Sequence, residues 1–87
     1  MEIDIIKQDV PFLLIPKQVL TDKNLSVESK GFYAMIYAVL PNRTFTLEEL
    51  GITTGLKDVA VMCILQELTT AGYMRISKDG KIYFNRI

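Results

Sequence analysis

A series of helix-start and helix-stop signals between Ser26 and Gly72 constrains the fold of this chain more than any other sequence feature. Ser26 is a favourable N-cap, because its hydroxyl can accept a backbone N–H from the first turn of a helix. The apolar spacing that follows predicts a helix from about Val27 to Val39. The face expected to be buried carries Phe32, Ile36, Val39 and Leu40.

A capping box predicts the start of a second, shorter helix. Thr46 and Glu49 have the spacing at which each side chain can accept the backbone N–H of the other residue. Gly51 and then Gly55 are expected to interrupt this helix within about two turns. Gly55 can adopt the positive φ that a tight turn between helices requires.

A third, longer helix is predicted from about Lys57 to Ala71, because Gly72 stands where helices commonly end in the left-handed conformation. The run from Val59 to Leu65 is apolar on all sides, and such a helix is normally buried on all sides. We therefore expect something to cover its second face. The stripe buried in the domain's own core is expected to consist of Val61, Ile64, Leu65 and Leu68.

Extended segments are predicted at both ends of the chain. The C-terminal segment is rich in Tyr, Ile and Phe around Asp79-Gly80, a dipeptide that favours a type I′ turn, so a two-stranded hairpin is expected there. Residues 1–16 favour a short N-terminal strand. A short helix is expected to follow Pro16, with Val19 and Leu20 on its apolar face.

Length and composition limit the possible functions. The 87 residues suit one domain, because a single core usually needs about 50 to 200 residues, so residues 1–87 are interpreted as one domain. The sequence has no His and one Cys, Cys63, which excludes a Cys/His zinc site, an internal disulfide and a Ser-His-Asp or Cys-His catalytic pair. We expect no enzymatic activity, no metal and no cofactor.

The charge is balanced overall but not along the chain. Ten Lys and Arg offset ten Asp and Glu, so no net field draws the protein to a polyanion. The segment 73–87 is the basic exception, with four cationic residues against one acidic residue, a net charge of +3. Its cations are Arg75, Lys78, Lys81 and Arg86. Binding to a polyanion would have to come from this local patch.

No membrane association is expected. The longest apolar run, Gly31 to Pro41, has 11 residues, well short of the roughly 18 that a bilayer-spanning helix needs. The first residues include Glu2 and Asp4 where a signal peptide would have Lys or Arg. A cytoplasmic location is therefore predicted.

The order helix, short helix, glycine-containing turn, longer helix and hairpin is the order of a winged helix-turn-helix. Characteristic motifs run through residues 12–74: Phe12 to Pro16, Leu25-Ser26, Ser29-Lys30-Gly31, Phe45-Thr46, Glu48-Glu49-Leu50, Thr54-Gly55, Leu65-Gln66-Glu67-Leu68 and Ala71-Gly72-Tyr73. In these motifs the sequence resembles the winged-helix domains at the start of phage and plasmid replication initiators and replisome organisers.

This resemblance implies an α+β fold, with a three-helix core, a possible short N-terminal helix, a short N-terminal strand and a C-terminal hairpin wing. It also implies a DNA-binding domain associated with replication or transcription regulation. In such a domain the helix after Gly55 would enter the major groove, and the wing would touch the DNA backbone. Many winged-helix proteins dimerise on paired half-sites, so a homodimer is expected.

The sequence departs from the family at the positions that would read bases. The outward positions of the third long helix hold Val59, Ala60, Met62 and Cys63, none of which can make a bidentate contact to a base. Weak, salt-sensitive contacts to the backbone of double-stranded DNA are expected instead. The residues predicted to make them are Lys57, Arg75, Lys78, Lys81 and Arg86.

Several alternatives remain open from the sequence. The same outward residues, Val59, Ala60, Met62 and Cys63, are the predicted partner interface of a protein-protein interaction or homodimerisation module that keeps the fold without reading DNA. The N-terminal segment of the chain could cover them instead. The cations of the hairpin could simply keep it solvent-exposed and discourage its strand edges from pairing with other chains. Tyr33 and Tyr37 are expected to be half-buried packing residues rather than a platform for stacked bases.

Overall fold

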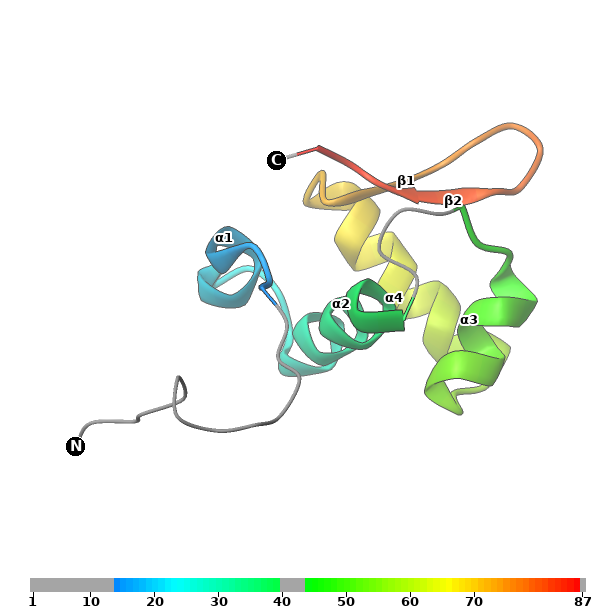
Figure 1. Cartoon of the computed structure of the whole chain (residues 1–87), viewed down its shortest axis with the longest axis horizontal. Helices are drawn as coiled ribbons and strands as arrows, with labels where there is room; N and C mark the ends of the chain where they lie inside the picture. The colour runs from blue at the N-terminus through cyan, green and yellow to red at the C-terminus, as the bar shows by residue number, and fades with distance from the viewer. Residues whose placement is uncertain (1–13, 40–43, 87) are drawn as a thin grey trace.

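The computed structural model describes residues 14–39 and 44–86, which form an α+β fold of four helices and one antiparallel hairpin. The helices are α1 (Lys17–Thr21), α2 (Val27–Val39), α3 (Leu47–Thr54) and α4 (Asp58–Thr70), and the strands are β1 (Met74–Ile76) and β2 (Ile82–Phe84). Helices α2, α3 and α4 contact one another in pairs, and β1 contacts α4. The hairpin runs along one edge of this helical layer (Figure 1).

The first two helices begin and end close to their predicted bounds. Helix α1 follows Pro16 directly. Of the two residues expected on its buried apolar face, Val19 is fully buried but Leu20 is exposed. The predicted N-cap of α2 is confirmed, because the Ser29 N–H donates to the Ser26 hydroxyl oxygen at 3.1 Å.

The capping box at the start of α3 is confirmed. The Glu49 N–H donates to Thr46 Oγ1 at 3.2 Å, and the Thr46 N–H donates to Glu49 Oε1 at 3.1 Å. Gly51 lies inside the helix and does not interrupt it; a Cβ there would approach the Leu56 carbonyl oxygen to 3.3 Å. The helix ends at Gly55, whose φ of 73° lies in the left-handed region that glycine tolerates.

One face of α2 differs from the prediction. Val39 was expected in the core but is 59% exposed, whereas Tyr33 is fully buried. The Tyr33 ring contacts the Phe84 ring edge-to-face, with 4.9 Å between ring centroids. The hairpin therefore supplies the apolar surface that buries Tyr33. The periodicity of the helix alone cannot show this contact, and Leu40 lies outside the described residues.

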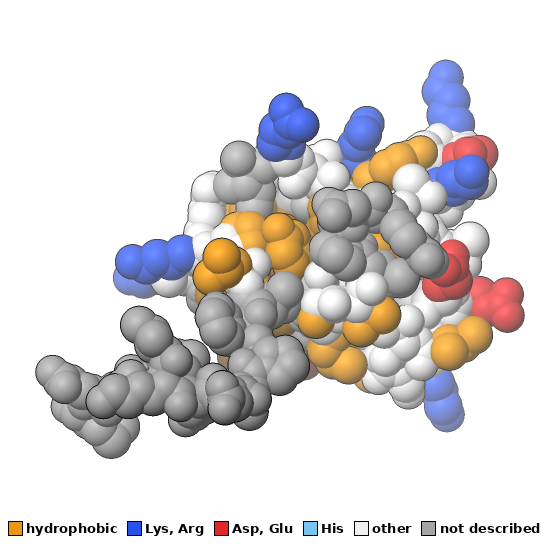
Figure 2. All heavy atoms as spheres, viewed as in Figure 1, with side chains coloured by type: hydrophobic (Ala, Val, Ile, Leu, Met, Phe, Trp, Pro, Cys, Tyr) orange, Lys and Arg blue, Asp and Glu red, His pale blue; other side chains and the backbone are white. Residues whose placement is uncertain are grey.

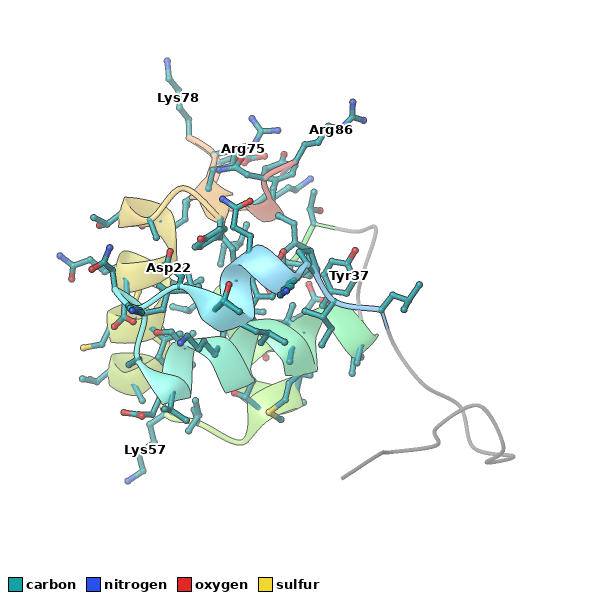
Figure 3. All side chains as sticks on the ribbon, turned by 90° about the vertical axis from the view of Figure 1, so that its left-hand side faces the viewer. Asp22, Tyr37, Lys57, Arg75, Lys78 and Arg86 are labelled. Atoms are coloured by element: carbon teal, nitrogen blue, oxygen red, sulfur yellow. The ribbon has the colours of Figure 1, made fainter. Side chains whose placement is uncertain are left out.

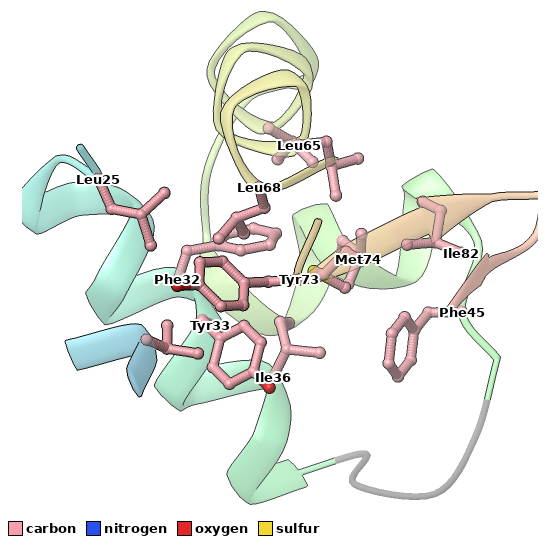
Figure 4. Close-up of a cluster of buried hydrophobic side chains, with 13 residues drawn as sticks. Leu25, Phe32, Tyr33, Ile36, Phe45, Leu65, Leu68, Tyr73, Met74 and Ile82 are labelled. Atoms are coloured by element: carbon pink, nitrogen blue, oxygen red, sulfur yellow. The ribbon is translucent and has the colours of Figure 1, made fainter. Parts of the chain in front are cut away.

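The core lies between the helices and the inner side of the hairpin (Figure 4). Helix α4 contributes the stripe predicted for it, since Val61, Leu65 and Leu68 are buried and Ile64 is partly buried. The other buried apolar residues are Val19, Leu25, Phe32, Tyr33, Ile36, Phe45, Leu50, Tyr73, Met74 and Ile82.

The predicted hairpin is present, but its turn is not of type I′. Strand β1 pairs with β2 so that Met74 lies opposite Phe84 and Ile76 opposite Ile82. A type I′ turn needs positive φ at both central residues, and among the described residues only glycines have positive φ. The loop closes through the Gly80 N–H, which donates to the Ser77 carbonyl at 3.0 Å, and Gly80 alone takes the left-handed conformation, with φ 85°.

A short backbone pairing joins the hairpin to the start of α3. The Phe45 N–H donates to the Ile82 carbonyl at 3.0 Å, and the Ile82 N–H donates to the Phe45 carbonyl at 2.9 Å. Both side chains are buried. The N-terminal strand predicted within residues 1–16 lies largely outside the described residues, and residues 14–16 form no strand.

The capping box yields a stability prediction. Thr46→Ala removes the side-chain acceptor of the Glu49 N–H and should lower the free energy of unfolding by about 1 kcal/mol. Urea denaturation followed by circular dichroism measures this difference. Thr44→Ala, two residues earlier and outside α3, is the matched control and should change stability less. Equal effects of the two substitutions would contradict the role of the cap.

Candidate functional site

Cationic side chains gather on the hairpin, at one end of the molecule. Arg75 lies on β1, Lys78 in the loop and Arg86 beyond β2, and Figure 3 shows all three pointing away from the same end of the fold. Lys81 directly precedes β2, and all four side chains are exposed. In Figure 2 most of the visible Lys and Arg side chains lie along the corresponding upper edge. The hairpin therefore presents a locally positive surface.

The loop between the strands is ordered by its one acidic residue. The Asp79 carboxylate accepts the Ser77 hydroxyl and, at 3.3 Å, the Lys81 backbone N–H. These hydrogen bonds hold the pKa of Asp79 below its ordinary value. Asp79 thus fixes the loop that carries Lys78, while its negative charge partly offsets the neighbouring lysines.

Arg75 is held by an aromatic partner. Its guanidinium carbon lies 4.8 Å from the centre of the Tyr83 ring, and the two residues face each other across the strand pair. Such a stacked cation is more restricted than a free arginine side chain.

Lys57 is not part of this surface. It occupies the N-cap position of α4, whereas the hairpin follows the C-terminal end of that helix. Figure 3 shows Lys57 and Lys78 at opposite ends of the molecule. The structure therefore brings together four of the five cations predicted to contact DNA and leaves Lys57 apart.

The outward face of α4 is apolar and exposed. Val59 is 77% exposed and Met62 53% exposed, and Cys63 is an exposed free thiol. Ala60 is turned elsewhere, toward a hollow between α2 and α4 that Phe32 and Ile64 also line. Three of the four predicted interface residues thus share one face. The idea that residues of the N-terminal segment cover this face concerns positions outside the described residues.

The hairpin adds a residue to this apolar face that the sequence did not single out. Ile76, at the end of β1, is 49% exposed and lines a shallow groove together with Val59, Met62 and Cys63. Ile76 alternates with Arg75 along β1 and so lies on the same side as the buried Met74, but it is the last residue of the strand and is exposed. We name Val59, Met62, Cys63 and Ile76 the α4 apolar face.

Two carboxylates tie the segment around α1 and α2 to the rest of the fold. Glu67 of α4 accepts the Ser26 N–H at the start of α2, and this hydrogen bond lowers the pKa of Glu67. Asp22 accepts the Tyr73 hydroxyl at 2.6 Å and the Asn24 N–H at 2.8 Å. These contacts lower the pKa of Asp22, and the bond to Asp22 raises the pKa of Tyr73.

The packing role predicted for the two α2 tyrosines is confirmed. Tyr33 is buried, which raises its pKa to about 12, so it is buried more deeply than the sequence predicted. Tyr37 is half-buried, and its ring stacks on Tyr33 with 5.8 Å between centroids. Neither ring forms an open platform for a base.

The part of the chain that the structure describes holds no group of three or more His, Cys, Asp or Glu side chains able to bind a metal ion. None of the helices within residues 14–39 and 44–86 has the length and apolar character needed to cross a bilayer. Comparisons with protein-family models, curated proteins and solved structures find no match to this chain.

The two lowered carboxyl pKa values predict acid sensitivity. Because the pKa values of Asp22 and Glu67 are below their ordinary values of 3.8 and 4.5, the folded state binds fewer protons than the unfolded state. Their stabilisation is complete above about pH 5 and is lost as the pH falls through the folded pKa values. Asp22→Asn/Glu67→Gln should therefore flatten the fall in urea midpoint between pH 6 and pH 3.

Glu48→Gln, at an exposed position of α3, is the control for this experiment. It should leave the acid dependence close to that of the wild type. An unchanged acid dependence in the double variant would show that the hydrogen bonds of these two carboxylates contribute nothing to stability.

Proposed function

We propose that this chain is a winged helix-turn-helix module that binds double-stranded DNA through phosphate contacts of its hairpin. The observation that carries the proposal is the concentration of exposed cations on the hairpin of a protein whose net charge is zero: Arg75, Lys78 and Arg86 at one end of the molecule (Figure 3), and Lys81 directly before β2. The succession of α2, α3, α4 and a hairpin supports it, because this is the order of elements in a winged helix-turn-helix.

In this proposal α4 occupies the position of the recognition helix. Three of its exposed residues, Val59, Met62 and Cys63, carry no side-chain group suited to bidentate hydrogen bonds with base edges. Apolar contact with thymine methyl groups is the readout open to them. Affinity therefore comes from phosphate contacts, which are strong at low salt and nearly independent of sequence.

The biological setting proposed here rests on the sequence resemblance. A winged-helix module similar to those of phage and plasmid replication initiators would act in DNA replication or transcription regulation in the cytoplasm. The role is one of binding, and no catalytic residue is assigned.

A salt titration tests the DNA-binding proposal. With three or four phosphate contacts, the logarithm of the binding constant should fall against the logarithm of the salt concentration with a slope of about −3. Lys78→Gln/Lys81→Gln should weaken binding to a duplex and reduce the steepness of that slope by about 2. Fluorescence anisotropy with a labelled duplex at a series of salt concentrations measures both quantities.

The matched control is Lys17→Gln/Lys23→Gln, which changes the net charge equally at two exposed positions of the α1 region. Its slope should stay near the wild-type value. Absence of binding even at low salt, or equal losses in the two double variants, would overturn the proposal. Lys57→Gln then reports whether the start of α4 also approaches the backbone.

The α4 apolar face favours a second function, association with a second copy of this chain. None of the four residues of the face is charged, and Asp58 is the one charged residue that lines the same groove. Two copies would therefore bring mainly apolar surface together there. Met62 can adjust its unbranched side chain to a facing surface. A homodimer formed through this face would withdraw Val59, Met62 and Cys63 from a DNA groove and leave DNA binding to the exposed cations of the hairpin.

Met62→Lys should abolish such a dimer, because association would bury an unpaired ammonium group. Analytical ultracentrifugation should show a concentration-dependent dimer for the wild type and a folded monomer for the variant. Val39→Lys, which introduces the same charge at an exposed apolar position of α2, should remain dimeric. A wild-type chain that is monomeric at all concentrations would contradict self-association.

A further inference from the structure

The outer side of the hairpin combines a cation with an aromatic ring in a fixed arrangement. Successive side chains of a strand point to opposite sides, so the buried Met74 and Ile82 place their neighbours Arg75 and Tyr83 on the side away from the core. Arg75 and Tyr83 are directly opposite each other in the register, and the guanidinium lies over the ring at 4.8 Å.

This stacking leaves the hydrogen-bond donors of Arg75 free and restricts the conformations of its side chain. A guanidinium is flat, and its N–H groups lie in its plane, so covering one face with a ring leaves the donors at the edge free. The ring also restricts the side-chain rotamers, so less entropy is lost when those donors bind a phosphate group. Lys78 and Lys81 have no aromatic partner among the described residues and carry their charge on flexible chains.

We infer that Arg75 is the principal phosphate-binding residue of the hairpin. Tyr83 is the positioning residue that restricts the Arg75 side chain to the conformation in which it binds phosphate. This inference rests on the proposed function and goes beyond it, because charge alone would make the four cations equivalent. The uncharged Tyr83 then contributes to the affinity for DNA, and it does so only by positioning Arg75.

The two residues are tested together in a double-mutant cycle of DNA affinity. Tyr83→Leu should weaken binding of a duplex about two- to fivefold, the range that corresponds to an exposed cation–π contact. Tyr83→Phe keeps the ring face and should bind as tightly as the wild type. Arg75→Lys keeps the charge but loses the flat, forked donor and should also bind more weakly. In an Arg75→Gln background, which removes the cation, Tyr83→Leu should have little further effect.

A measurement on the free protein separates the inference from the proposed function. The ring current of Tyr83 should shift the side-chain proton resonances of Arg75 upfield in the wild type and in Tyr83→Phe, and the shift should disappear in Tyr83→Leu. If the wild type binds no DNA, the proposed function fails and the inference with it. If it binds DNA but the cycle is additive, or Arg75 shows no ring-current shift, only the inference is overturned. Thermal unfolding of each variant shows that the fold is retained.

Discussion

The pairing of Phe45 with Ile82 is the contact on which the position of the hairpin and its cations depends. A two-stranded hairpin is marginally stable by itself in water. Here two backbone hydrogen bonds of 3.0 and 2.9 Å fix it to the segment ahead of α3, and both side chains enter the core. The Phe45 ring also meets Phe84 edge-to-face, with 5.4 Å between centroids. The hairpin is thereby held against the helices, with its cations at one end of the molecule.

The acidic residues near α4 have structural roles that leave the positive surface intact. The sequence places Glu67 on the helix proposed to face DNA, where its charge would oppose phosphate binding. In the fold, Glu67 accepts the Ser26 N–H and so anchors the start of α2. Asp22 has a comparable role, because it binds the hydroxyl of Tyr73 just before β1. Both carboxylates join segments distant in sequence.

Local signals predicted most of the fold, and non-local contacts account for what was missed. The caps at Ser26 and Thr46 and the glycine at 55 fixed helix bounds that the structure confirms. Tyr33 is buried and Val39 is exposed because the hairpin packs against Tyr33. The helical periodicity of α2 carries no information about that contact. The candidate site was predicted residue by residue, but its geometry was not: Lys57 lies apart from the hairpin, and Ile76 extends the exposed α4 face. The separation of Lys57 from the other cations and the position of Ile76 both depend on where the hairpin packs on the helices.

We propose that this domain binds the DNA backbone and does not read a sequence through α4. A competition experiment, in which unlabelled duplexes of equal length and unrelated sequence displace a labelled duplex at one salt concentration, tests it most directly. The account predicts nearly equal competition by every duplex, because phosphate contacts carry no sequence information. A duplex that competes about a thousandfold better than the others, as expected of a specific site, would contradict it.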